Sequence, residues 1–392
     1  NMKNSRHIII LASIALIFII ATFFSEPTNI QISGAGEKLY PEFLPRVNDA
    51  TYIKIQTNQE TLTLTKSQDQ WTVKENDNYP AAINKVRELV LGVGNLKLVE
   101  PKTKKPENYA RIGLQDVTEE GATSTHITII AGSDKKLADL IIGNNKPAKS
   151  DASQKSYYVR KVNDPQSWLV DGNLPDKWQP KDWLDVDIIE IPRERIQQVK
   201  VSHEDGEIVY IHRDNPNARD FTLESLQPGE QVTAPYEVNN IATTFTKMTF
   251  DDVVSAANAG VSDKPVYTAI LTTFDGLEIT FEPFAKDDKH FARYSAGFND
   301  EAAQRYQETL SQKESAEKSG EATTTPDTPA ADPHAASDKK KLELKSVKEV
   351  KQEVELYNKR WQNWLYQLPE FRVKNIGKKK ADLLKKDQRP VH

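Results

Sequence analysis

The sequence predicts an α+β protein in which two tandem repeats, each an antiparallel sheet with a packed helix, follow one N-terminal transmembrane helix. Three observations predict it: an apolar run near the N-terminus, alternating segments typical of β-hairpins, and a second set of such segments in the same order. The 392 residues carry a net charge of -5 and include no Cys. The acidic balance argues against a general nucleic-acid binder, and the missing Cys excludes disulfides and Cys-based metal sites.

The apolar run covers residues 8–24 and contains only two polar side chains. As a helix it would be about 26 Å long, close to the thickness of the hydrocarbon core. Because Lys3 and Arg6 precede it, we expect residues 1–7 in the cytoplasm and the bulk of the chain on the extracytoplasmic side of the bacterial inner membrane. A cleaved secretory signal is the alternative, although no small-residue cleavage motif follows the run. Residues 25–44 are expected to be a tether.

The first repeat is expected over residues 45–190. Residues 51–56 and 62–64 alternate between apolar and polar, and a two-residue loop would place Ile55 opposite Leu62 and Ile53 opposite Leu64. A short strand at 71–73 continues the sheet. After Pro80, apolar residues spaced by 3, 4 and 3 predict an amphipathic helix. These residues are Ile83, Val86, Val90 and Val93.

The second repeat, over residues 191–376, shows the same pattern. A three-residue loop with Gly206 in the left-handed conformation would place Val201 opposite Val209 and Val199 opposite Ile211. A strand follows at 221–223. After Pro235 the 3, 4, 3 spacing returns at Val238, Ile241, Phe245 and Met248. In both repeats a proline precedes the first apolar position by three residues, and proline suits the first helical turn.

Later segments also correspond between the two repeats. Each has a second hairpin, at 126–143 and at 266–284, and each ends in a Trp-Leu segment, at 168–175 and at 364–369. Residues 313–341 lack aromatic residues, Val, Ile and Leu, so we expect a disordered insertion there. Apolar residues then recur at steps of three or four from Leu344 to Leu368, which predicts one long helix ending before Pro369.

The arrangement resembles the family catalogued as domain of unknown function 4340, with a similarity that covers most of residues 45–384. The segments that carry the resemblance are 53–55, 71–73, 82–93, 157–191 and 361–384. Members have one N-terminal span followed by duplicated extracytoplasmic domains, and they are linked with ABC-type transport systems, including those similar to gliding-motility permeases. The family has no established active site, so the resemblance supplies no catalytic, cofactor-binding or metal-binding residue.

From this resemblance we expect a non-enzymatic auxiliary component of a transport system that acts as a protein-binding platform. The expected partner is a membrane protein, in particular an ABC-type permease complex, and the sequence suggests no nucleic acid, cofactor or small-molecule substrate. The basic tail at 377–392 is expected to be solvated, or alternatively to contact anionic lipid or an acidic polymer.

An envelope glycan-binding protein or hydrolase is the alternative function. Asp182, Asp185 and Asp187 follow Trp178 and Trp183, and glycoside hydrolysis needs two carboxyl groups about 5–9.5 Å apart. A solvated turn between the repeats, with the Trp side chains packed beneath it, explains the same pattern without a reaction.

Other patterns argue against reactive sites. None of the seven His forms an HxH or HExxH pair, and the hairpin register would place His203 and His212 on opposite faces of the sheet. The glycines at 34 and 36 lie in the predicted tether, and those at 92 and 94 are expected to cap a helix. The sequence contains no phosphate-binding GxxxxGK[ST] motif.

Overall fold

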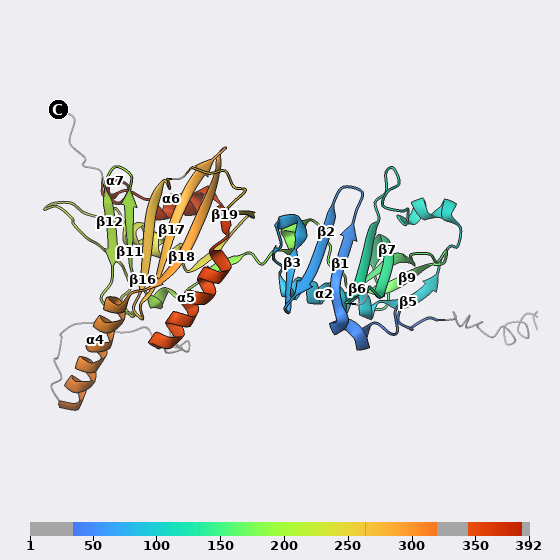
Figure 1. Cartoon of the computed structure of the whole chain (residues 1–392), viewed down its shortest axis with the longest axis horizontal. Helices are drawn as coiled ribbons and strands as arrows, with labels where there is room; N and C mark the ends of the chain where they lie inside the picture. Colours follow the sequence, from blue (N-terminus) through green and yellow to red (C-terminus); the bar gives the residue numbers. More distant parts are fainter. Residues whose placement is uncertain (1–33, 133, 263, 320–343, 386–392) are drawn as a thin grey trace, which may run out of the picture. The chain divides into compact units, whose positions relative to one another are not determined.

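The computed structural model describes residues 34–132, 134–262, 264–319 and 344–385. The chain divides into two compact units, shown with their elements in Figure 1. The first unit comprises Asn1–Trp71 and Ile83–Asp182, and the second comprises Thr72–Ala82 and Trp183–His392. Both contain large antiparallel sheets and helices, which confirms the α+β class. No helix within the described residues is long and apolar enough to cross a bilayer, and the predicted anchor at 8–24 lies outside them.

The first large sheet has nine strands in the order β4-β3-β2-β1-β6-β7-β8-β9-β5. They are β1 (Ala50–Gln56), β2 (Thr61–Ser67), β3 (Gln70–Val73), β4 (Tyr79–Pro80), β5 (Lys97–Pro101), β6 (Thr125–Ala131), β7 (Lys136–Pro147), β8 (Lys155–Lys161) and β9 (Ser167–Gly172). The predicted pairs Ile55–Leu62 and Ile53–Leu64 are both confirmed. All four side chains are buried because the alternation places them on one face.

Helix α2 (Ile83–Asn95) confirms the predicted helix, with two differences in detail. Pro80 lies in β4 and not in the first helical turn. Gly92 and Gly94 lie within the helix and do not cap it. A Cβ on Gly92 would approach the carbonyl oxygen of Asn173 to 2.3 Å, so glycine is needed there for close packing. Short 3-10 helices complete the connections: η1 (Leu44–Asp49), η2 (Lys74–Asn76), η3 (Pro106–Ile112), η4 (Pro180–Trp183) and η5 (Arg193–Arg195).

The second large sheet has eight strands in the order β13-β12-β11-β16-β17-β18-β19-β15. They are β11 (Ile196–His203), β12 (Ile208–His212), β13 (Thr222–Leu223), β15 (Asp252–Ser255), β16 (Tyr267–Thr273), β17 (Leu277–Lys286), β18 (Lys289–Phe298) and β19 (Trp364–Leu368). A separate pair is formed by β10 (Asp187–Glu190) and β14 (Lys247–Thr249). The predicted pairs Val201–Val209 and Val199–Ile211 are confirmed, and Gly206 has the expected positive φ of 88°.

The two large sheets share one strand order. Without β4, the first sheet has the order β3-β2-β1-β6-β7-β8-β9-β5. The second sheet has the order β13-β12-β11-β16-β17-β18-β19-β15, so the strands match one to one, beginning with β3 and β13 and ending with β5 and β15. A helix lies at the same place in each series, α2 between β4 and β5 and α3 (Pro235–Thr243) between β13 and β14. Pro235 occupies the first turn of α3, as predicted. The helix ends at Thr243, however, so the last two positions of the predicted stripe lie beyond it: Phe245 follows the helix and Met248 lies in β14.

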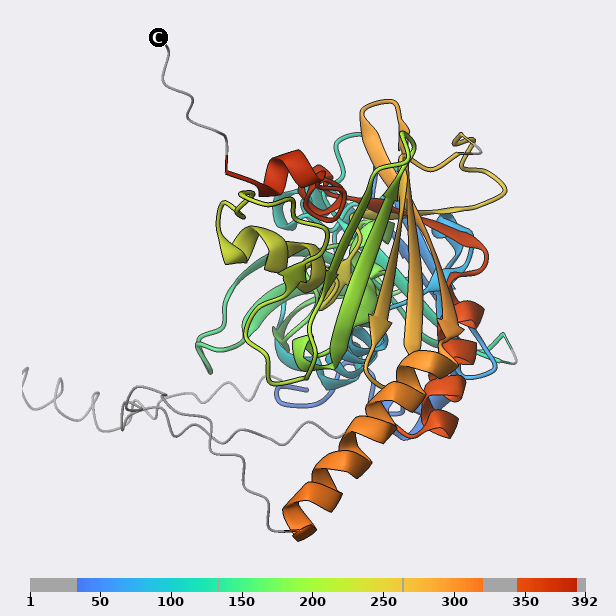
Figure 2. The same ribbon diagram turned by 90° about the vertical axis from the view of Figure 1, so that its left-hand side faces the viewer.

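The remaining helices belong to the second unit. They are α4 (Asp300–Ser319), α5 (Val347–Trp361), α6 (Glu370–Ile376) and α7 (Lys380–Leu383). Helices α3 and α6 lie together beside the sheet, and α4 extends away from the body of the unit (Figure 2). The backbone of residues 313–319, at the start of the predicted insertion, continues α4, and residues 320–341 lie outside the described part.

The prediction of one helix from Leu344 to Leu368 is wrong at its C-terminal end. Helix α5 stops at Trp361, and residues 364–368 form β19, which pairs with β15 and β18. Leu365, Tyr366 and Leu368 are buried in this strand. Because a few apolar residues fit either period, the pairing with two neighbouring strands decides the conformation.

Residues 72–82 complete an aromatic cluster in the second unit. Tyr79 is fully buried, with its ring centroid 5.4 Å from that of Phe250 and 5.0 Å from that of Trp364, both edge-on. The ring of Tyr366 lies 6.1 Å away. The backbone of this segment also bonds within the unit, since the Asp185 N–H donates to the Pro80 carbonyl over 3.0 Å. The chain therefore passes between the two units three times.

Candidate functional site

A cavity of about 480 Å³ opens at one end of the sheet in the first unit. It is formed by the turn between β1 and β2, the segment entering β6, a bulge in β7, the start of β8 and the segment after β9. Its lining residues are Thr57–Glu60, Ala122–Thr125, Ile142, Gly143, Asn145, Lys155, Tyr157, Leu174–Asp176, Trp178 and Gln179. Most of these side chains carry a hydroxyl, amide or carboxylate group.

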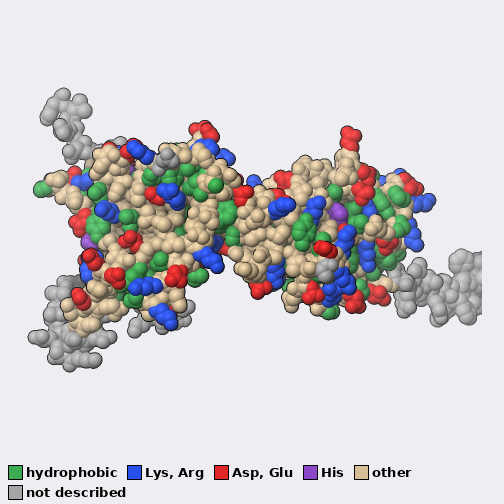
Figure 3. Space-filling view, viewed as in Figure 1, with side chains coloured by type: hydrophobic (Ala, Val, Ile, Leu, Met, Phe, Trp, Pro, Cys, Tyr) green, Lys and Arg blue, Asp and Glu red, His purple; other side chains and the backbone are tan. Residues whose placement is uncertain are grey.

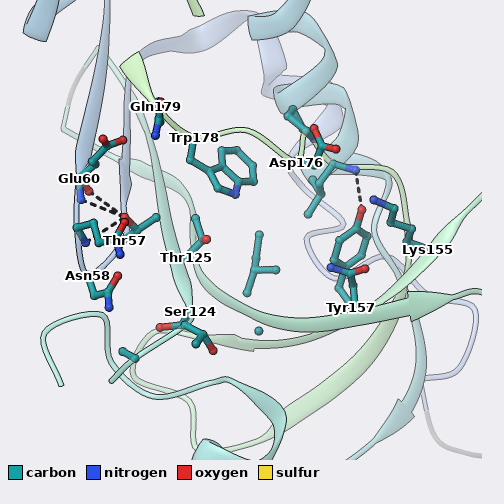
Figure 4. A pocket seen from close by; sticks show the side chains of 18 residues that line it. Thr57, Asn58, Glu60, Ser124, Thr125, Lys155, Tyr157, Asp176, Trp178 and Gln179 are labelled. Carbon is teal, nitrogen blue, oxygen red and sulfur yellow. Dashed lines mark hydrogen bonds between the residues drawn. The ribbon is translucent and has the colours of Figure 1, made fainter. Parts of the chain in front are cut away.

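Two aromatic side chains form the inner wall of the cavity. Figure 4 shows the indole of Trp178 between the β1–β2 turn and the side chains of Tyr157 and Lys155. The Tyr157 ring is buried, and its hydroxyl accepts a hydrogen bond from the Leu174 N–H over 3.2 Å. Burial raises the pKa of Tyr157, the bond from Leu174 opposes that rise, and the nearby Asp176 carboxylate adds to it. The hydroxyl therefore stays neutral and fixes the segment that carries Trp178.

The β1–β2 turn is held by its own backbone and by one hydroxyl. The Thr57 Oγ1 accepts hydrogen bonds from the backbone N–H groups of Gln59 (3.3 Å) and Glu60 (3.1 Å), and the Thr57 N–H donates to the Glu60 carbonyl. Threonine hydroxyls stabilise turns in this way. The exposed side chains of Asn58 and Gln59 are thus presented at the mouth of the cavity by a fixed loop.

The acidic residues that the sequence singled out are divided between the two units. Asp182 belongs to the first unit, whereas Asp185 and Asp187 belong to the second. The Asp185 carboxylate lies 3.0 Å from the Arg360 guanidinium, which also donates to the Asp187 carbonyl. Trp183 is buried in the core. Among these predicted residues, Trp178 alone lines the cavity.

The histidines in the described part of the chain make isolated contacts. His126 lies 2.7 Å from the Asp139 carboxylate, and His212 lies 2.6 Å from Glu224. In the β11–β12 register His212 is on the face opposite Val199 and Val201, and His203 shares their face, as predicted. No group of three or more His, Asp or Glu side chains capable of holding a metal ion occurs among the described residues. His7, His334 and His392 lie outside them.

A second, apolar groove lies beside α2 in the first unit and has a volume of about 420 Å³. Trp71, Val86 and Val90 form its buried floor, and Ile83 and Leu91 stand at its edge with 49% and 40% of their surface exposed. Charged side chains, Lys66, Asp69 and Arg87, complete the rim. Exposed Ile and Leu side chains next to a buried apolar floor are typical of a protein-binding surface.

The C-terminal cations have partners within the second unit, so residues 378–385 are docked on it while several of their side chains stay exposed. Residues 386–392 of the predicted tail lie outside the described part. Lys378 pairs with Glu237, Lys379 with Asp205, and Lys380 with Glu230 at 2.7 Å. Beneath them, Ile376 and Leu383 are buried. In the face shown in Figure 3, acidic and basic side chains are interspersed over each unit. All six basic side chains from Arg372 to Lys385 have a partner in this unit. Four pair with carboxylates, Arg372 donates to the Lys247 carbonyl, and Lys385 donates to the Gln231 side-chain carbonyl.

Sequence reasoning found Trp178 but missed both concave surfaces. The cavity gathers five separate segments, and no local pattern marks Asn58, Asn145 or Gln179 as neighbours. For the groove, the sequence did contain a signal, namely more apolar residues in α2 than one buried stripe needs. The predicted stripe included Ile83, which is half exposed in the structure, whereas Leu89, outside the predicted stripe, is buried.

Comparisons with known proteins give one result. A family model described as "Domain of unknown function (DUF4340)" matches residues 71–270. No curated protein and no solved structure matches the chain. The matched range begins at β3 in the first large sheet and ends in β16 of the second. Because the match covers just over half of the chain, the protein belongs to the DUF4340 family.

Proposed function

We propose that this protein is a non-enzymatic, protein-binding component of an ABC-type transport system, similar to gliding-motility systems, at the bacterial cytoplasmic membrane. The observation that carries the proposal is the apolar groove beside α2, with its buried floor of Trp71, Val86 and Val90. The charged side chains that rim the groove suit a protein partner, because protein interfaces combine an apolar centre with a polar border.

The occupant that we propose is an extracytoplasmic segment of a permease in the same membrane. Residues of η1, Val47 and Asn48, form part of the groove, and they lie close in sequence to the point where the described chain begins, at residue 34. The predicted span ends at residue 24. The nine residues between them can extend over at most about 30 Å, so an anchored chain would hold the groove near the bilayer. A partner in that membrane would then be present at high effective concentration, and a small interface would suffice.

We further propose that the two units arose as tandem repeats behind a single transmembrane helix. The shared order of eight strands and the matching place of α2 and α3 support the repeat. The apolar sequence at 8–24 supports the anchor. Two related sheets would give the platform separate surfaces for different subunits of one complex.

The hydrolase alternative receives less support. Asp185 is held by Arg360, and Asp182 belongs to a different unit from Asp185 and Asp187. A pair of acids flanking a bond would have to face one shared cavity. The cavity at Trp178 supports the glycan-binding alternative.

The proposal is tested by Ile83→Asp combined with Leu91→Lys in the full-length protein. An acid in the first turn and a lysine near the last suit the helix dipole, so α2 should remain folded while the groove edge becomes polar. We expect affinity purification in mild detergent to lose the permease that the parent protein retains. Ile208→Asp is the matched control, because Ile208 is an apolar side chain in β12 with 55% exposure.

Equal recovery of the permease with the groove variant and with the control would refute the groove as its docking surface. If the parent protein copurified with no integral membrane protein, the transport proposal itself would fail. Circular dichroism of both variants checks that α2 and the sheets are retained.

A further inference from the structure

We infer that the cavity of the first unit is a binding site for an uncharged oligosaccharide. The inference goes beyond the proposed role in transport and does not depend on it. It rests on three properties of the cavity: polar side chains without internal partners, an aromatic wall, and a charge balance that disfavours anions.

The polar lining offers unused hydrogen-bonding groups. The side chains of Asn58, Gln59, Asn145 and Gln179 make no hydrogen bond to another residue in the described ranges. Each is an amide with two N–H donors and one carbonyl acceptor. Sugar hydroxyls also donate and accept, so four amides around one cavity match a surface rich in hydroxyl groups.

The aromatic wall supplies the apolar contact that a sugar ring needs. A pyranose ring has a face of C–H groups, and the flat indole of Trp178 is a large, rigid surface on which such a face can lie. Figure 4 shows this indole between the polar side chains of the turn and those of β8. The bond from Leu174 to Tyr157 fixes the neighbouring backbone, so little ordering is required on binding.

Charge and size narrow the ligand class. The cavity has two carboxylates, Glu60 and Asp176, against one ammonium group, Lys155. Phosphorylated or sulfated ligands are therefore disfavoured, and the lining has no glycine-rich phosphate loop. Lipid chains are disfavoured by the many amides and hydroxyls. The volume of about 480 Å³ falls within the range of roughly 300–1,000 Å³ found for small-molecule sites and suits a short glycan.

The inference is tested by ligand-observed saturation-transfer NMR on the full-length protein in a detergent without a sugar headgroup. The probes are chitotriose, cellotriose and maltotriose. We expect binding of at least one, weakened on the order of tenfold by Trp178→Ala, because a central aromatic contact contributes much of the affinity of such sites. Gln179→Ala and Asn145→Ala should each weaken it about two- to tenfold through a lost hydrogen bond.

The controls are Trp168→Ala in β9, which changes a half-buried tryptophan outside the cavity, and Gln227→Ala, which changes an exposed glutamine in the second unit. Both should leave the affinity within about twofold of the parent, since neither residue lines the cavity. Because Asn145 and Gln179 are exposed, their variants keep the test valid even where Trp178→Ala disturbs folding.

Absence of saturation transfer to all three trisaccharides would overturn the inference. So would binding that the Asn145, Trp178 and Gln179 variants leave unchanged, or tighter binding of a sulfated trisaccharide than of its neutral parent. Failure here is distinguishable from failure of the transport proposal. The groove variants at Ile83 and Leu91 should leave saccharide binding intact, and the cavity variants should leave recovery of the permease intact.

Discussion

Asp139 shows how a single residue can join several elements of the first unit. Its carboxylate lies 2.7 Å from His126 Nε2, accepts a hydrogen bond from Thr128 Oγ1 over 3.2 Å and pairs with Lys136 Nζ over 2.5 Å. Its backbone carbonyl accepts a further bond, 2.8 Å long, from the Tyr40 hydroxyl. The side chain of Asp139 thereby connects β7 with β6, and its backbone carbonyl connects β7 with the segment that leads into the unit.

These contacts make part of the stability depend on pH. Burial alone would raise the pKa of Asp139, but the hydrogen bonds from Lys136 and His126 outweigh it and hold the pKa below its usual value. A lowered pKa stabilises the fold above the unfolded pKa of about 3.9, and that stability is lost as the pH falls through the folded value.

We therefore expect Asp139→Asn to cost stability near neutral pH and to cost progressively less as the pH falls below about 4. Chemical denaturation at several pH values measures this difference. Asp134→Asn, an exposed change in the adjoining turn, is the control. A constant difference between parent and Asp139→Asn at all pH values would contradict the assignment.

The ion pair between Asp185 and Arg360 predicts that Asp185 contributes to stability, whereas Asp182 does not. Asp185→Asn should lower the free energy of unfolding by about 0.5–1 kcal/mol, because both partners are partly exposed and Arg360 keeps its bond to the Asp187 carbonyl. Asp182→Asn should have no measurable effect. Urea unfolding of the two variants checks this, and equal losses in both would count against a structural role for the pair.

At the scale of elements, helix α5 covers the part of strand β18 that strand β19 leaves unpaired. Strand β18 pairs with β19 only over residues 290–292, and α5 packs along its remaining length. There the Asn358 amide replaces a partner strand. Its Oδ1 accepts from the Ala296 N–H and its Nδ2 donates to the Ala296 carbonyl, both over 2.8 Å.

Asn358→Ala should lower the free energy of unfolding by about 1–3 kcal/mol, because it leaves both backbone groups of Ala296 without partners. Alanine is the better helix former, so the loss cannot be assigned to the helix itself. Lys359→Ala, an exposed change at the next position, is the control. Thermal unfolding distinguishes the two, and an unchanged midpoint for Asn358→Ala would show that α5 does not protect the strand.

The elements themselves show which signals in the sequence are reliable. Both hairpin registers were predicted correctly because alternation and turn length together fix which residues face each other. Residues 364–368 were assigned to a helix by spacing alone, whereas the structure forms a strand both there and at the corresponding Trp-Leu segment, in β9. Periodicity over so short a segment is ambiguous, and only the neighbouring strands decide.

The candidate sites were harder to predict for a related reason. Trp178 stood out as an aromatic residue near acids, but the amides around it come from separate turns that the fold brings together. The acids that stood out beside it in the sequence are divided between the two units. Proximity along the chain thus identified one cavity residue, Trp178, whereas the three acids do not line that cavity.

At the scale of the whole molecule, a substitution within the first repeat should loosen the second unit. Tyr79→Ala removes a fully buried ring from the cluster of Phe250, Trp364 and Tyr366. We expect a loss of about 3–5 kcal/mol in the stability of that unit, the usual range for large aromatic deletions.

Hydrogen exchange measured by mass spectrometry can locate this effect. Peptides from β15 and β19 should lose protection in Tyr79→Ala, while those from β6 and β7 should keep it. Tyr236→Ala, which changes a tyrosine with 61% exposure, should alter neither set. Loss of protection in β6 and β7 alone would contradict the assignment of residues 72–82 to the second unit.

Because the chain passes between the units three times, the parts of the second unit are synthesised at widely separated times. Tyr79 leaves the ribosome long before its neighbour Tyr366 is made, and at roughly 5–20 residues per second the interval is about 15–60 s. During that time the Tyr79 ring lacks its contacts with Trp364 and Tyr366, although Phe250 is made earlier. The second unit can complete its core only when nearly the whole chain has been made, so a nascent chain that stalls before residue 364 leaves the Tyr79 ring without two of its three aromatic neighbours.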